Sequence, residues 1–129
     1  MIMQAPYLLV KDTADKGRGV FTTAYIDADT IIEIAPVIVM TAADRHHLDK
    51  TLLHDYIFEW GPQHTECCMA LGLVPIYNHS YASNCEYYMD FEESMMMIKT
   101  VRAIAPDEEL TINYNGNWND DKKLWFDAR

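Results

Sequence analysis

The chain has 129 residues, half of them hydrophobic, which is enough for one domain with a buried core and excludes a disordered tail. Twenty acidic and ten basic residues give a net charge of −10. This charge repels nucleic acid and attracts a cationic partner such as a Lys-rich peptide, although acidity can also serve solubility alone.

The three cysteines lack the spacing of a disulfide framework. Cys67 and Cys68 are adjacent, and Cys85 stands apart. An odd number of cysteines without paired spacing is typical of a reducing compartment. The first residues, MIMQAPYLLVKD, hold neither a basic n-region nor a long apolar run. We therefore expect a cytoplasmic protein, or a nuclear one in a eukaryote, with no signal peptide and no membrane span.

The first third of the chain predicts strands. YLLV (7–10) and VFTTAY (20–25) are joined by the turn KDTADKGRG. TIIEIAPVIVM (30–40) is rich in β-branched residues, and Pro36 within it predicts a break, a bulge or a sheet edge.

The clearest helix is predicted for residues 41–55, TAADRHHLDKTLLHD. Thr41 is a candidate N-cap with Asp44 three residues later. Leu48, Leu52 and Leu53 would share one face of this helix. Residues from about 41 to 72 would then form a helical insert within a single domain of residues 1–129.

The remaining residues again predict strands. YIFEWG returns to a strand that stops at Gly61-Pro62, and EYYMDF and MMMIKTV form a hairpin closed over EES. IAPDEELTINY predicts a turn at Pro106-Asp107 that feeds a last strand, residues 109–114. Many short strands with one main helix indicate an all-β or β-dominated α+β fold.

The stretch YNHSYASNCEYY (77–88) gathers uncharged polar groups between tyrosines, and a metal site and a glycan site are two ways to explain it. The spacing of the nearby ligand types is not that of a zinc site, because Cys67 and Cys68 form no CxxC pair. The histidines fit a solvated helix face better. Asn78-His79-Ser80 matches the N-glycosylation pattern, but glycosylation requires secretion. A buried polar network and a ligand pocket remain as explanations.

Two further motifs are ambiguous when taken alone. KGRGVF (16–21) holds paired glycines, which expose backbone to a ligand but more often simply make a turn. Tyr114 ends the last predicted strand, where its hydroxyl could face a cleft or be satisfied within the core. The acidic run at residues 107–109 is expected to be solvated.

Together, these motifs resemble the SET-domain protein lysine methyltransferases. KGRGVF resembles the glycine loop of that family, YNHS its Asn-His-Ser motif, and DEELTINY (107–114) its Glu-Glu-Leu-Thr-x-x-Tyr motif, in the same order. The resemblance covers roughly residues 5–126. It implies a β-clip fold of short sheets with a C-terminal pseudoknot, S-adenosylmethionine on one face, and a target lysine entering through a channel from the opposite face.

The resemblance also implies roles for individual residues. Tyr114 would be the catalytic tyrosine, and NCEYYMDF places Tyr87 in the lysine channel, as in monomethylating members. Near the C-terminus, LWFD resembles the segment whose aromatic stacks on adenine, which makes Trp125 the candidate. The contacts to the cofactor's methionine portion and near its adenine would come from Gly17, Arg18, Gly19, Asn78 and His79.

The chain also departs from the family pattern. Ile112 stands two residues before Tyr114, where the family often has an aromatic that controls the degree of methylation. YAS replaces the usual Cys-x-Pro, which leaves Tyr81 and Ser83 without an explanation. A cysteine-rich post-SET segment is absent from the sequence, so no metal is expected, and a possible homodimer or the aromatic C-terminal residues would close the site.

The chemistry implied is methyl transfer to a lysine of a basic protein, such as a histone-like tail. At neutral pH only about one free lysine in a thousand is neutral, so an apolar channel and the sulfonium charge must lower the amine pKa. The alternatives are a non-catalytic SET-fold module that binds basic peptides or a protein partner, and a β-rich small-molecule binder. The set Asn78, His79, Tyr87 and Tyr114 favours the enzyme.

Overall fold

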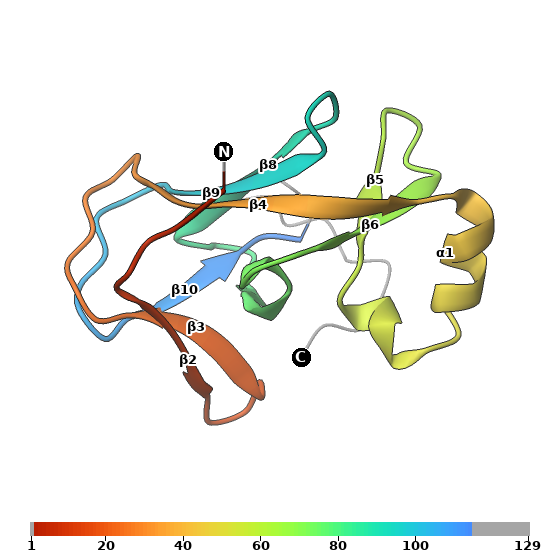
Figure 1. Cartoon of the computed structure of the whole chain (residues 1–129). Helices are drawn as coiled ribbons and strands as arrows, with labels where there is room; N and C mark the ends of the chain where they lie inside the picture. The colour runs from red at the N-terminus through yellow and green to blue at the C-terminus, as the bar shows by residue number, and fades with distance from the viewer. Residues whose placement is uncertain (1, 115–129) are drawn as a thin grey trace.

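Two small, curled sheets enclose the core in the computed structural model, which describes residues 2–114 (Figure 1). The larger sheet contains β1 (Met3–Gln4), β4 (Ile31–Met40), β5 (Phe58–Trp60), β6 (Glu66–Ala70), β8 (Cys85–Asp90) and β9 (Met95–Thr100). The smaller sheet contains β2 (Leu8–Asp12), β3 (Arg18–Thr22), β7 (Asn78–His79) and β10 (Glu109–Ile112). The helical elements are α1 (Ala42–Leu48) and the 3₁₀ turns η1 (Leu52–Asp55) and η2 (Val74–Ile76). The β-dominated fold predicted from the sequence is confirmed.

The long strand β4 is the centre of the larger sheet. Its first half pairs with β1 and β9, and its second half, from Val37, pairs with β6. Pro36 lies where β1 has ended and β6 has not yet begun, so the N–H that proline lacks is not needed in a ladder. The bulge of this strand falls instead between Ile31 and Glu33, and it coincides with two consecutive buried residues, Ile32 and Glu33.

The predicted helix of residues 41–55 is wrong in length. The capping box is present, since Asp44 N donates to Thr41 Oγ1 and Thr41 N donates to Asp44 Oδ2. The helix nevertheless ends at Leu48, because the hydroxyl of Thr51 donates to Leu48 O at 2.7 Å and begins a separate 3₁₀ turn. The expected leucine face is not buried: Leu52 is 74% exposed. The second half of the 41–72 insert is the β5–β6 hairpin, so helical structure is confined to its first half.

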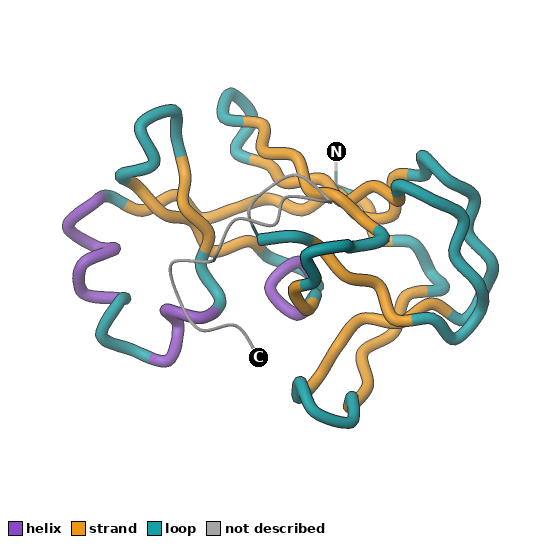
Figure 2. The backbone as a smooth tube through the Cα atoms, turned by 180° about the vertical axis from the view of Figure 1, so that it is seen from behind, coloured by secondary structure: helices purple, strands orange, loops and turns teal. Residues whose placement is uncertain are grey.

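The insert of residues 41–72 begins at one end of the molecule. Figure 2 shows α1 and η1 together at that end, whereas η2 lies near the middle, between the two sheets. The predicted hairpin of EYYMDF and MMMIKTV is present as β8 and β9. No helix among residues 2–114 has the length and apolar character needed to cross a membrane.

Strand β10 joins the segments that carry the motifs. It pairs antiparallel with β3, which follows the glycine loop, and parallel with β7, the Asn-His dipeptide. Thr111 lies opposite Asn78 and Ile112 opposite His79. Segments more than thirty residues apart in sequence thus meet in one sheet. The predicted pseudoknot involves the chain after residue 114, which lies outside the described residues.

The core lies between the two sheets. Its fully buried members include Val20, Ile32, Met96, Ile98, Ile104, Leu110 and Ile112. These side chains come from β3, β4, β9 and β10, except that Ile104 lies in the connection between β9 and β10, so burial of apolar area fixes the position of one sheet on the other.

Candidate active site

The glycine loop is a structured turn between β2 and β3. Thr13 organises it: its hydroxyl donates to Gly17 O and accepts from Lys16 N, both at 2.8 Å. Gly17 has φ +72°, a conformation that residues with a Cβ rarely adopt, and a Cβ there would meet nothing within 4 Å. The backbone of Gly17 therefore borders open space and can be approached by a ligand.

Asn78 bridges the glycine loop and the last strand. Its Nδ2 donates to Arg18 O at 3.1 Å and to Glu109 Oε2 at 2.7 Å. A Cβ on Gly19 would lie 2.5 Å from Glu109 Oε2 and 2.9 Å from Asn78 Nδ2, so any side chain at this position would displace the Asn78–Glu109 hydrogen bond. Arg18 contributes its carbonyl to this arrangement.

His79 supports Tyr114, the candidate catalytic residue, through a hydrogen bond to its backbone. Its Nδ1 accepts a hydrogen bond from Tyr114 N at 3.0 Å, which requires a neutral ring, and burial followed by the charge of Lys16 lowers the pKa of His79. Its Nε2 is the one buried side-chain nitrogen or oxygen of the described residues without a hydrogen-bond partner. The rings of His79 and Tyr81 lie edge-to-face with centroids 4.3 Å apart, so Tyr81 packs directly against this imidazole.

Tyr81 and Ser83, which the sequence left unexplained, make contacts within the fold. Besides packing against His79, Tyr81 accepts a hydrogen bond from Asn113 Nδ2 on its carbonyl at 3.3 Å. The hydroxyl of Ser83 is buried and donates to Cys85 O at 2.8 Å. Both contacts shape the loop between β7 and β8.

Tyr114 and Tyr87 lie together beside Phe58. The Tyr114 hydroxyl donates to Tyr77 O at 2.7 Å, and the Tyr87 hydroxyl donates to Tyr114 O at 3.1 Å. The Phe58 ring contacts both rings edge-on, with centroid separations of 5.4 Å to Tyr87 and 6.2 Å to Tyr114. Burial raises the pKa of Tyr87, so this phenol stays neutral at physiological pH. Each hydroxyl proton is directed at a carbonyl oxygen, so each phenol oxygen acts as a donor in the bond described and keeps its lone pairs for accepting.

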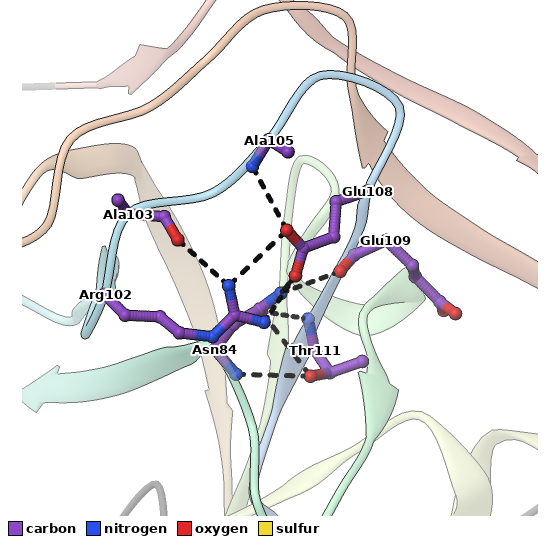
Figure 3. Close-up of polar contacts among 7 residues, drawn as sticks. All are labelled: Asn84, Arg102, Ala103, Ala105, Glu108, Glu109 and Thr111. Carbon is purple, nitrogen blue, oxygen red and sulfur yellow. Dashed lines mark hydrogen bonds and ion pairs between the residues drawn. The ribbon is translucent and has the colours of Figure 1, made fainter.

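The polar network around Glu108 fixes β8, and hence Tyr87, against β10. Figure 3 shows Arg102 and Asn84 converging on Glu108. Asn84 also donates to Glu109 O at 2.8 Å and accepts from Thr111 N at 2.8 Å. The hydrogen bond from Arg102 is the largest cause of the lowered pKa of Glu108. The acidic run expected to be solvated is therefore built into the fold at Glu108 and Glu109.

The structure brings together most of the residues predicted from the sequence. Gly17, Arg18, Gly19, Asn78 and His79 form one side, and Tyr87 and Tyr114 form the other. Ile112 is fully buried in β10, opposite His79, so it supports the site from the core rather than exposing a surface. Trp125 lies outside the described residues.

Other residues of the site were missed by sequence reasoning. Lys16 Nζ donates to His79 O at 3.0 Å, and Phe58, Tyr77 and Glu109 make the contacts given above. A signal was present only for Glu109, which belongs to the Glu-Glu-Leu-Thr motif. Residues 2–114 hold no group of three or more His, Cys, Asp and Glu side chains that could bind a metal ion.

Comparison with known proteins identifies the arrangement. A family model for the SET domain matches residues 17–115. The chain is 33% identical over 127 residues to a Schizosaccharomyces pombe histone-lysine N-methyltransferase described as H3 lysine-37 specific, covering 98% of this chain and 80% of that protein. A crystal structure of a Plasmodium falciparum protein, described as a candidate histone methyltransferase, has a TM-score of 0.64 at 24% identity, covering 90% of this chain and 98% of that one. At this identity the structural likeness supports the fold alone.

Proposed function

The chain belongs to the SET-domain family of protein lysine methyltransferases, and we propose that it adds a single methyl group to a lysine of a histone or another Lys-rich protein. The observation that carries the proposal is the convergence of Tyr87 and Tyr114, with their oxygens as acceptors, beside the Asn78–His79 strand. A module that only binds peptides would not need this set in one place.

The glycine loop and the Asn78–His79 strand fit S-adenosylmethionine, whose sulfonium supplies the methyl group when it is bound. Gly17 borders open space, and the carbonyl of His79 accepts an amine donor, as its bond to the Lys16 ammonium demonstrates. We propose that the backbone of Gly17–Gly19 holds the amino-acid portion, and that Asn78, His79 and Trp125 bind near the adenine. Lys16 would have to release His79 O if the adenine amino group takes that acceptor.

The tyrosine pair would receive the lysine. Both phenol oxygens can accept N–H bonds from the amine, which leaves the nitrogen lone pair directed at the methyl carbon. The neutral amine would form the N–C bond as the S–C bond of the sulfonium breaks, and the methylammonium product would then release one proton to solvent. The aromatic walls, Phe58 among them, keep water away and favour the neutral amine.

The same geometry favours one methyl group. A primary amine with its lone pair on the methyl carbon has two N–H bonds, one for each tyrosine oxygen. A monomethylated amine has one, so a second turnover would leave an acceptor of the pair unpaired, at a cost of about 1–3 kcal/mol. Tyr87 is thus proposed to limit methylation, in place of an aromatic at Ile112.

The substrate class follows from the relative and from charge. The S. pombe relative is named for histone H3, and a net charge of −10 would steer a cationic tail to the enzyme. All three cysteines are free and buried, which supports a reducing compartment, the nucleus or the cytoplasm. The homodimer expected from the sequence stays a prediction, which light scattering of the purified protein tests.

The function is tested by comparing wild type with Tyr114→Phe. We expect calorimetry to show S-adenosylmethionine binding to both proteins, and only the wild type to transfer labelled methyl to purified core histones. Full activity of Tyr114→Phe would refute the role of Tyr114. Failure of the wild type to bind cofactor at millimolar concentration would refute the enzyme.

A further inference from the structure

Glu33, a buried residue of β4, is connected to Tyr114 through Tyr77. Glu33 is 1% exposed, although it belongs to an otherwise apolar stretch of β4. Its Oε2 accepts from Leu73 N at 2.7 Å and its Oε1 from the Tyr77 hydroxyl at 3.0 Å. A buried carboxylate is costly, and an apolar pair of similar volume would be as stable or more so.

Two features of the backbone accommodate this carboxylate. The bulge in β4 directly precedes Glu33 and breaks the alternation that would have left one of Ile32 and Glu33 outside. Gly72, with φ +68°, lies against Oε2, where any Cβ would overlap the carboxylate. The local backbone is therefore shaped around the carboxyl group of Glu33.

Tyr77 connects this carboxylate to the active site. Its side chain is 1% exposed and donates to Glu33, while its backbone carbonyl accepts the Tyr114 hydroxyl at 2.7 Å. Tyr77 follows η2 directly and precedes Asn78, and its backbone is extended, with φ −60° and ψ 128°. Rotation of this peptide would remove the acceptor from the Tyr114 hydroxyl. The Glu33 hydrogen bond opposes that rotation by fixing the far end of the Tyr77 ring.

We propose that Glu33 and Tyr77 are positioning residues for methyl transfer. They hold the Tyr77 carbonyl where it takes the Tyr114 proton, and so keep the Tyr114 oxygen turned toward the lysine amine. The inference rests on the proposed function for its catalytic part. Its structural part, the control of the Tyr114 hydroxyl by a residue that touches neither substrate nor cofactor, can be measured without turnover.

The test uses Tyr77→Phe, which removes one oxygen, with Tyr88→Phe as the matched control. Tyr88 donates to Glu86 at 2.6 Å, so the control also loses a Tyr–Glu hydrogen bond, but on an exposed ring. With labelled S-adenosylmethionine and purified core histones, we expect Tyr77→Phe to lower kcat about tenfold and to change the KM for cofactor less than about twofold. Tyr88→Phe should match the wild type.

Two variants of Glu33 separate positioning from simple stability. Glu33→Gln can still accept from Leu73 N and can donate to the Tyr77 hydroxyl, so kcat should stay within about threefold of wild type. Glu33→Asp keeps the charge but is one methylene too short to reach both partners, so it should lose kcat as Tyr77→Phe does. Wild-type kcat in both folded Tyr77→Phe and folded Glu33→Asp would overturn the proposal.

A turnover-independent measurement completes the test. The exchange rate of the Tyr114 hydroxyl with solvent is read from tyrosine labelled with ¹³C at Cζ, and the resonance is assigned with Tyr114→Phe. We expect exchange to be at least about tenfold faster in Tyr77→Phe and unchanged in Tyr88→Phe. Unchanged exchange in Tyr77→Phe would overturn the positioning role. An inactive wild type with the expected exchange rates would instead refute the proposed function alone.

Discussion

Changing Asn78 to aspartate would replace the N–H donor that joins the glycine loop to β10 with a carboxylate oxygen, which can only accept. Asn78→Asp is nearly isosteric, but it places a carboxylate oxygen 2.7 Å from Glu109 Oε2 and 3.1 Å from Arg18 O, where an N–H now donates. Asn78 is largely buried, so water can compensate little of this change.

The magnitude follows from two effects. Loss of a hydrogen bond to a charged group costs about 2 kcal/mol. Two carboxylates whose charge centres are about 4 Å apart repel by about 4 kcal/mol at an effective dielectric constant of about 20. Glu109 is only half-buried, so its carboxylate can turn toward water and relieve part of the repulsion. We therefore expect a net loss of about 3 kcal/mol in the free energy of unfolding at about pH 7.5.

Urea unfolding of the wild type, Asn78→Asp, Glu109→Gln and the double variant measures this loss. The double variant Asn78→Asp/Glu109→Gln restores a donor opposite the carboxylate and should recover about 2 kcal/mol. The single variant should also lose less stability near pH 5, where one of the two carboxyls takes up a proton. A cost that is independent of pH, or a double variant no more stable than Asn78→Asp, would refute the reasoning.

Two further predictions concern a pH dependence and the C-terminal residues. The lowered pKa of His79, caused by burial and then by the charge of Lys16, means that below about pH 6.5 the unfolded chain binds a proton that the folded chain resists. The free energy of unfolding should therefore decrease as the pH is lowered through this window. His79→Asn, whose side-chain oxygen can accept from Tyr114 N, should make this decrease smaller when urea unfolding is repeated at several pH values. The same dependence of stability on pH in both proteins would contradict this. Trp125→Ala should weaken S-adenosylmethionine binding about tenfold in calorimetry, because stacking on a base is worth about 1–3 kcal/mol, while Trp118→Ala should not. Equal affinities of these two variants would argue against Trp125.

The sequence predicted those parts of the fold whose signals are local. The hairpin of β8 and β9 follows from alternation around a turn, and the capping box from Thr41 with Asp44 three residues later. The helix length was missed because Thr51 competes for Leu48 O, and the leucines beyond it find no surface to cover. A hydrophobic period alone does not show whether a core exists opposite it.

The candidate site was predictable from motifs but not from the contacts that complete it. The family resemblance located Asn78, His79 and Tyr114, since each lies in a short, ordered motif. Glu33 was hidden because one acid in a β-branched run does not indicate whether it points inward. Only the bulge in β4 and the distant Gly72 reveal its burial.

The account is tested most directly by mass spectrometry of purified core histones after incubation with the wild-type protein and S-adenosylmethionine. We predict one methyl group on a lysine side chain, with dimethyl and trimethyl products at background even after long incubation. Cofactor binding without any methylated lysine would contradict a core histone as the substrate. Abundant trimethyllysine would contradict the role given to Tyr87.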